Sequence, residues 1–180
     1  MVCVLDRPRS KLENDNEHEH EHDLRRGKKI HWQLFDTGNS LTLSQPWIPF
    51  NAPMKTVIST IEAPTALGPY SQAIGAGPFV FCSGQIPLEP ETGVLIEGDI
   101  SAQTRRVLEN IAAVLRAHGL RMEHVVKTTV FMTDLADFAK MNAAYAGYFP
   151  IDPPARSTIQ VAALPKGANV EIEAIAFKLS

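Results

Sequence analysis

Two charged features have residue types that could do chemistry: an arginine that follows two prolines, and two glutamates on one predicted strand. Arg156 follows Pro153-Pro154-Ala155, whose restricted backbone would fix the direction of the guanidinium. That planar group can hold a carboxylate through two parallel hydrogen bonds, although a surface ion pair is the alternative. In Glu171-Ile172-Glu173, the alternation of a strand places both carboxylates on one face. Buried carboxylates need partners, and Arg156 on a neighbouring strand is a candidate.

The candidate nucleophiles and the histidines of residues 54–180 predict no further chemistry. The sequence contains no P-loop, dinucleotide fingerprint or Gly-x-Ser-x-Gly elbow. His118 and His124 have no Cys or carboxylate at metal-ligand spacing, so no catalytic metal is expected. Ser83 lacks an obvious base partner, and Cys82 falls in an apolar run, where a small core residue is the preferred interpretation.

Composition excludes several classes of protein. The 180 residues carry a net charge of -3, unlike the strongly basic balance of a dedicated nucleic-acid binder. No apolar run approaches the roughly 20 residues that cross a bilayer, so no membrane partner is expected. Cys3 and Cys82 form no disulfide pattern, and a reducing cytoplasm is therefore the predicted location.

Residues 1–53 differ in character from the rest of the chain. They contain four of the six histidines, three of them in the run Glu17-His18-Glu19-His20-Glu21-His22-Asp23. This run could bind Zn or Ni, but an extended tail gives the ligands no supporting contacts, which favours a solvated low-complexity tail. The segment also lacks the apolar core of a signal peptide and is too acidic for a transit peptide. We expect 1–53 to be a disordered or non-native extension, with Met54 as an alternative start, and 54–180 to be one domain.

Residues 54–180 alternate short apolar strands with two periodic helices. Strands are predicted at 56–58, 72–76, 79–83, 125–132, 156–163 and 170–177. One helix is capped by Asp99 or Ser101 and runs to about His118, with a single apolar stripe made of Val107, Leu108, Ile111, Val114 and Leu115. A second helix is capped by Asp134 and ends before Pro150. The order β-β-β-α-β-α-β-β predicts an α+β, two-layer fold in which both helices cover one face of a mixed sheet.

Five motifs are spread over this domain in a fixed order. They are Gly68-Pro69-Tyr70-Ser71-Gln72, Ser83-Gly84-Gln85-Ile86-Pro87, Val126-Lys127-Thr128-Thr129-Val130, Pro154-Ala155-Arg156-Ser157 and Glu171-Ile172-Glu173-Ala174-Ile175-Ala176. Together they resemble the Rid family (YjgF type), and more narrowly its RidA branch, the 2-iminobutanoate/2-iminopropanoate deaminases. Five ordered motifs are far more specific than any one alone.

The resemblance implies a chorismate-mutase-like (YjgF) fold and a homotrimer whose active sites lie in the clefts between subunits. It also implies hydrolysis of reactive imine and enamine acids, such as 2-aminoacrylate and 2-iminobutanoate, to 2-oxo acids and ammonia. Pyridoxal-phosphate enzymes such as threonine dehydratase release these intermediates. The hydrolysis itself is expected to need no cofactor and no metal.

The same resemblance assigns roles to seven residues. Arg156 matches the arginine that grips the substrate carboxylate, and Glu171 matches the acid that positions the attacking water. Four further positions match the residues that line the pocket: Tyr70, Ser83, Gly84 and Asn142. Thr158 stands where many members have cysteine; because that position is thought to act partly through its backbone, activity is expected to survive.

Two other functions are attached to proteins of this kind. One is an endoribonuclease or translation inhibitor, but residues 54–180 carry 10 basic and 12 acidic side chains and no basic stripe, so poor RNA affinity is expected. The other is a trimer that binds metabolites without turnover. The joint presence of Arg156 and Glu171 favours the enzyme.

Overall fold

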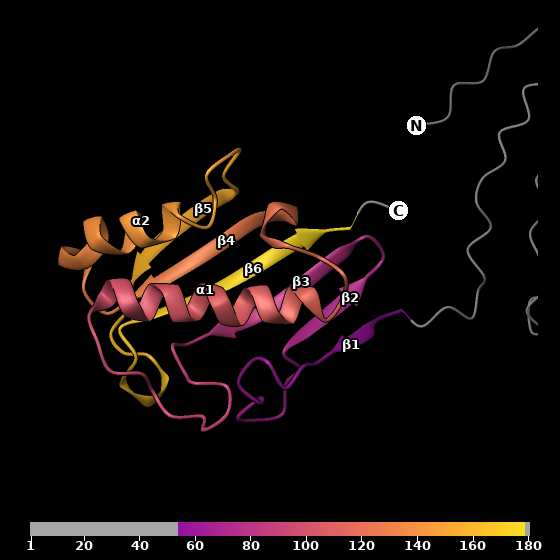
Figure 1. Ribbon diagram of the computed structural model, residues 1–180, viewed down its shortest axis with the longest axis horizontal. Helices are drawn as coiled ribbons and strands as arrows, with labels where there is room; N and C mark the ends of the chain where they lie inside the picture. Colours follow the sequence, from indigo (N-terminus) through magenta and orange to yellow (C-terminus); the bar gives the residue numbers. More distant parts are fainter. Residues whose placement is uncertain (1–53, 179–180) are drawn as a thin grey trace, which may run out of the picture. The chain divides into compact units, whose positions relative to one another are not determined.

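A computed structural model describes residues 54–178, and its elements follow the predicted order (Figure 1). The strands are β1 (Thr56–Ile58), β2 (Ala73–Ala76), β3 (Phe79–Gln85), β4 (Val125–Met132), β5 (Ala155–Gln160) and β6 (Val170–Phe177), and the α-helices are α1 (Ile100–Arg116) and α2 (Phe138–Ala146). Short 3-10 turns lie at Met122–His124, Leu135–Asp137 and Pro165–Gly167. The predicted extension and its Glu/His run lie outside the described residues. None of the helices described is long and apolar enough to cross a membrane.

The order of the strands explains why both helices lie on one face. The sheet has the order β1-β2-β3-β6-β4-β5, and only β4 and β5 pair in parallel. β3 and β4 both run antiparallel to β6, so α1 joins two strands of the same direction, as α2 does for β4 and β5. Such crossovers are almost always right-handed, and two that advance in the same direction place their helices on the same face. Figure 1 shows α1 and α2 on that face, which confirms the predicted two-layer fold.

The core lies between the covered face of the sheet and α1. All five residues of the predicted stripe are fully buried: Val107, Leu108, Ile111, Val114 and Leu115. They belong to one apolar cluster with alternate residues of the strands, among them Val80 and Cys82 on β3 and Val130 on β4. Burial raises the pKa of the Cys82 thiol to about 12, so this residue is the unreactive core cysteine that the sequence predicts.

No element of residues 54–178 covers the opposite face of the sheet, called the open face below. It carries exposed apolar side chains on several strands, including Val57 (61% exposed), Phe81 (45%) and Ile159 (47%). Phe79 packs between Phe81 and Phe177 there, with ring centres 6.3 and 5.4 Å away. Adjoining apolar side chains on an exposed surface are typical of a contact with another protein.

Several element boundaries differ from the prediction by one or two residues, such as the end of β3 at Gln85, and two larger differences have a clear cause. β5 ends at Gln160 rather than at Ala163, because its only neighbour in the sheet, β4, ends at Met132. Asp134 caps the 3-10 turn by accepting a hydrogen bond from Ala136 N, so α2 itself begins only at Phe138.

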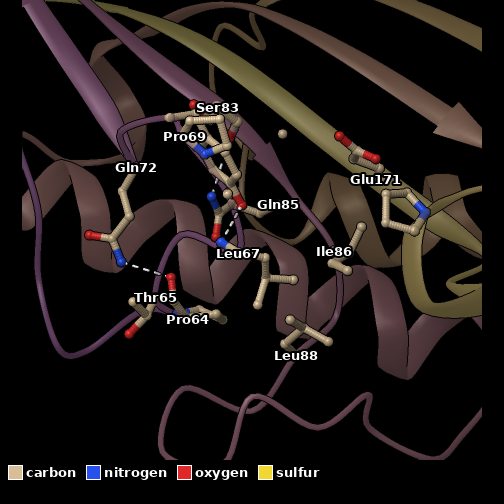
Figure 2. Close-up of a pocket in the computed structure, with 14 residues that line it drawn as sticks. Pro64, Thr65, Leu67, Pro69, Gln72, Ser83, Gln85, Ile86, Leu88 and Glu171 are labelled. Carbon is tan, nitrogen blue, oxygen red and sulfur yellow. Dashed lines mark hydrogen bonds between the residues drawn. The ribbon is translucent and has the colours of Figure 1, made fainter.

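The loop between β1 and β2 folds around one buried amide. Gln72 Nε2 donates to the carbonyl oxygens of Thr60, Ala63 and Pro64 at 3.0, 3.2 and 2.8 Å, and Gln72 Oε1 accepts from Thr60 N at 2.6 Å. Backbone groups that leave water need such partners, and this one side chain serves four of them. Figure 2 shows Gln72 reaching Pro64 across the loop.

We expect Gln72→Leu to destabilise the domain by about 1–3 kcal/mol, because it leaves the buried carbonyls of the loop without donors. Urea unfolding followed by circular dichroism measures the change. Gln160→Leu is the control: the Gln160 amide accepts one exposed bond, from Leu135 N, so its loss should change the free energy of unfolding by less than about 0.5 kcal/mol. Equal midpoints for Gln72→Leu and the wild type would contradict this role.

Candidate active site

A pocket of about 560 Å³ lies where β3 and β6 meet the loop held by Gln72 (Figure 2). Four of the predicted site residues line it together: Tyr70, Ser83, Gly84 and Glu171. Most of the other lining side chains are apolar, among them Leu67, Ile86, Leu88 and Pro165. An apolar wall with a few convergent polar groups is typical of a small-molecule site.

The Glu171 carboxylate lies directly against the backbone of Gly84. A Cβ atom at residue 84 would overlap Glu171 Oε1 and lie 2.8 Å from the carboxyl carbon, so glycine alone leaves room for this side chain. The space lies at a β-bulge, because the pairing of β3 with β6 shifts between Cys82 and Gln85. The motif Ser83-Gly84 therefore has a structural reason: it seats the carboxylate.

Glu171 is half-buried on the open face of β6. Burial raises the pKa of its carboxyl above the ordinary value, and the negative charge of Glu173 raises it further. Within residues 54–178, Glu171 forms no salt bridge. A carboxylate with a raised pKa is a better proton acceptor near neutral pH than an exposed one.

The hydroxyls of Ser83 and Tyr70 are each bonded to the nearby loop. Ser83 Oγ donates to Ser71 O at 2.7 Å, and Tyr70 OH accepts from Leu67 N at 3.2 Å. Ser83 therefore keeps its lone pairs, and Tyr70 keeps its proton, for a bound molecule.

Arg156 lines a different pocket, of about 290 Å³, together with Asn142 and Tyr145 of α2. Arg156 Nη2 donates to Asn142 Oδ1 at 2.8 Å, and the guanidinium carbon lies 4.6 Å from the centre of the Tyr145 ring. No carboxylate of the described chain lies within salt-bridge distance of Arg156. The guanidinium thus keeps its charge and most of its N–H donors for an incoming anion.

Arg156 and Glu171 lie on opposite faces of the sheet. Arg156 is in register with Thr128, which is buried beneath α2, whereas Glu171 is in register with Phe131, on the open face. In addition, β4 separates β5 from β6. The expectation that Arg156 pairs with Glu171 or Glu173 from a neighbouring strand is therefore wrong within residues 54–178, because β5 is an edge strand of the described sheet and its neighbour there is β4.

Asn142 and Thr158 lie with Arg156 rather than with Glu171. Thr158 follows Arg156 by two residues on β5 and therefore projects from the same face. Tyr145 was not among the predicted site residues, because its spacing along the second helix is that of a core residue. It is indeed 4% exposed, but its ring also faces Arg156. Its position three residues after Asn142, on the same helix face, is the signal that could have found it.

Within 54–178, no group of three His, Cys, Asp or Glu side chains is placed to hold a metal ion. His118 and His124 line neither of the two pockets described above.

Comparison with known proteins decides the family. The sequence model of the endoribonuclease L-PSP family matches residues 60–178. The chain belongs to this family, also called Rid or YjgF. A RutC family protein of Pyrococcus horikoshii is 55% identical over 125 residues, which are 69% of this chain and 99% of that relative.

Two further proteins are similar to this Rid protein over nearly their whole length. The 2-iminobutanoate/2-iminopropanoate deaminase of Salmonella typhimurium is 49% identical over 128 residues, covering 69% of this chain and 99% of the relative. The crystal structure of Escherichia coli TdcF with bound serine has a TM-score of 0.66 at 46% identity and covers 69% of this chain and 99% of that one. The Rid resemblance and the chorismate-mutase-like fold expected from it are thereby confirmed.

We expect Glu171→Gln to stabilise the Rid domain at neutral and higher pH. Because the pKa of Glu171 is raised on folding, the wild type loses stability as the pH rises from the ordinary glutamate value of 4.5 through the raised value. The neutral glutamine avoids this loss. Thermal midpoints should therefore be higher for the variant at about pH 8 and should converge with the wild type below about pH 4.

Glu91→Gln removes one negative charge from an exposed turn and serves as the control. Its thermal midpoint should follow that of the wild type at both pH values. A Glu171→Gln variant that is less stable than the wild type at about pH 8 would contradict the burial argument.

Proposed function

We propose that this Rid protein hydrolyses 2-imino acids and their enamine tautomers to 2-oxo acids and ammonia. The water oxygen forms a bond to C2, the C2–N bond breaks, and both water protons end on the nitrogen, which leaves as ammonia. One observation carries the proposal: an arginine and a glutamate are both held without a counter-charge from the described chain. The first suits a substrate carboxylate, and the second suits an attacking water.

Arg156 binds the substrate carboxylate through two parallel hydrogen bonds. Asn142 accepts one guanidinium N–H and leaves the others available, and Thr158 lies beside them on the same strand face. The carboxylate fixes the position of C2, so the reacting carbon always lies at the same place relative to the clamp.

Glu171 orients the water and takes a proton from it, and its raised pKa suits this task near neutral pH. Gly84 allows the carboxylate to lie against β3, and Ser83 and Tyr70 present hydroxyls to the same pocket. The proton then passes to the nitrogen as the C2–N bond breaks. These steps use groups of the chain itself, and the proposal includes no cofactor or metal.

The names of two relatives support this reaction. The relative in Salmonella typhimurium is named a 2-iminobutanoate/2-iminopropanoate deaminase, and TdcF of Escherichia coli has been solved with bound serine. Serine carries the same α-carboxylate as a 2-imino acid, so a clamp of the Arg156 type suits both molecules.

The complete site requires more than one copy of the chain, and we propose the homotrimer that the resemblance implies. Arg156 and Glu171 lie on opposite faces of one sheet, so one chain cannot bring both to one substrate. The exposed apolar side chains of the open face supply a surface for assembly. The cytoplasmic location expected from the cysteines stays a prediction.

A coupled assay tests the function. Threonine dehydratase supplies 2-iminobutanoate from threonine, and formation of 2-oxobutanoate is followed with and without the Rid protein. We expect the protein to accelerate this step in proportion to its concentration. No acceleration at any concentration would remove the proposal.

Arg156→Ala and Arg156→Lys should each lower the rate of imine hydrolysis by about 100-fold or more while the oligomer stays intact. The lysine variant keeps the charge and loses the planar two-bond geometry, so it isolates the geometry from the charge. The assay above gives the rate, and light scattering after size exclusion gives the mass. Unchanged hydrolysis in either variant would contradict the clamp.

Mixed oligomers test the shared site. Arg156→Ala and Glu171→Gln chains, each inactive alone, are co-expressed with different tags and purified together. If each site takes Arg156 from one copy and Glu171 from its neighbour, every mixed trimer that carries both tags regains one of its three sites, about a third of the wild-type activity. Mixed oligomers as inactive as their parents would place both residues of a site in one chain.

The family model is described as an endoribonuclease, but no contact among residues 54–178 favours RNA cleavage. Arg106, Arg116 and Arg121 are engaged in ion pairs with glutamates rather than aligned as a free basic surface. We therefore propose the deaminase alone.

A further inference from the structure

We propose that Tyr145 and Thr128 are positioning residues for Arg156: the tyrosine ring supports the guanidinium, and the threonine hydroxyl fixes the ring. The inference rests on the proposed function, in which Arg156 binds the substrate carboxylate. It gives a role to two side chains that otherwise belong only to the interior of the fold.

The guanidinium of Arg156 is held by neutral groups of α2. Its central carbon lies 4.6 Å from the centre of the Tyr145 ring and 5.7 Å from that of Phe138, both within the range of a cation–π interaction. Asn142 Oδ1 accepts one N–H at 2.8 Å. Three neutral contacts therefore set the direction of the side chain and leave its charge uncompensated. A carboxylate in the place of any of them would compete with the substrate.

The Tyr145 ring is itself held from two sides. Its hydroxyl forms a hydrogen bond of 2.8 Å with Thr128 Oγ1, in which either oxygen can donate, and both side chains are buried. The Phe149 ring packs against it, with ring centres 4.7 Å apart. Thus the ring has fixed contacts at its hydroxyl end and along its face.

These contacts connect β4, β5 and α2 with one another. Thr128 on β4 is in register with Arg156 on β5, and Tyr145 of α2 touches both of them. A displacement of the ring would therefore displace the guanidinium relative to the strand that carries it. Burial also raises the pKa of the Tyr145 phenol, against smaller opposing effects of Thr128 and Arg156, which keeps the ring neutral beneath the cation.

Three variants test the proposal through the binding of 2-oxobutanoate, a carboxylate product, measured by isothermal titration calorimetry. Tyr145→Phe and Thr128→Val each remove the same hydrogen bond at nearly constant volume and should weaken binding about threefold. Tyr145→Leu removes the ring and should weaken it about tenfold. The double variant Tyr145→Phe/Thr128→Val should bind as each single variant does, because both changes remove one shared interaction. In steady state, KM should rise more than kcat falls.

Two controls separate positioning from stability. Tyr148→Phe removes an exposed hydroxyl 3.3 Å from Arg105 O, and Thr104→Val removes a buried hydrogen bond to Ile100 O. Neither residue lines the pocket of Arg156. Thr104→Val is expected to lower the thermal midpoint and Tyr148→Phe to leave it nearly unchanged, because only the first loses a buried bond. Neither control should change 2-oxobutanoate affinity. Should Tyr145→Leu fail to fold, the double-variant comparison decides, since it uses only small changes.

The proposal is overturned if Tyr145→Phe and Thr128→Val change only the thermal midpoint, or if their effects on affinity multiply. It is also overturned if Arg156→Ala binds 2-oxobutanoate as tightly as the wild type, because Arg156 is then no clamp. The proposed function fails in a different way: the wild type binds 2-oxobutanoate, the positioning variants weaken that binding, and no imine is hydrolysed.

Discussion

Because α1 and α2 cover the same face of the sheet, the alternation of each strand assigns every side chain to a covered or an open face. Val80 and Val130 fall on the covered face and fill the core, while Phe81 and Ile159 fall on the open one. The same alternation separates the functional groups: Arg156 projects beneath α2, and Glu171 projects away from it. This separation is the reason for the proposed assembly, in which a second copy of the chain would bring the missing residue to the site.

Arg156 and Glu171 have no charged partners in the described chain, and each lies against neutral groups. Glu171 has space because the bulge of β3 brings a glycine against its carboxylate, although burial still disfavours the ionised form. Arg156 lies over an aromatic ring and against an amide oxygen. Neither Glu171 nor Arg156 forms an ion pair within the described chain. Such a pair would neutralise the charge and would also block a ligand.

Much of this arrangement could be predicted from the sequence. The stripe of α1, the order of the elements and the site side chains of the Glu171 pocket follow from local periodicity and from ordered motifs. The separation of Arg156 from Glu171 could not be read from it, because the insertion of β6 between β3 and β4 is a long-range pairing that no local pattern specifies. The contact of Tyr145 with Arg156 could not be predicted either. A helical spacing that indicates burial does not show whether the buried ring also faces a cation.

The edge position of β5 has a consequence for how such a protein can change over generations. None of its six residues is buried, so β5 contributes little to the interior that the other strands share. Arg156 lies on this strand, whereas the core is built by α1 and the neighbouring strands. If Arg156 binds the substrate as proposed, substitutions on β5 that alter the bound anion would cost the fold little, so the specificity of such a protein could change while its core stays the same.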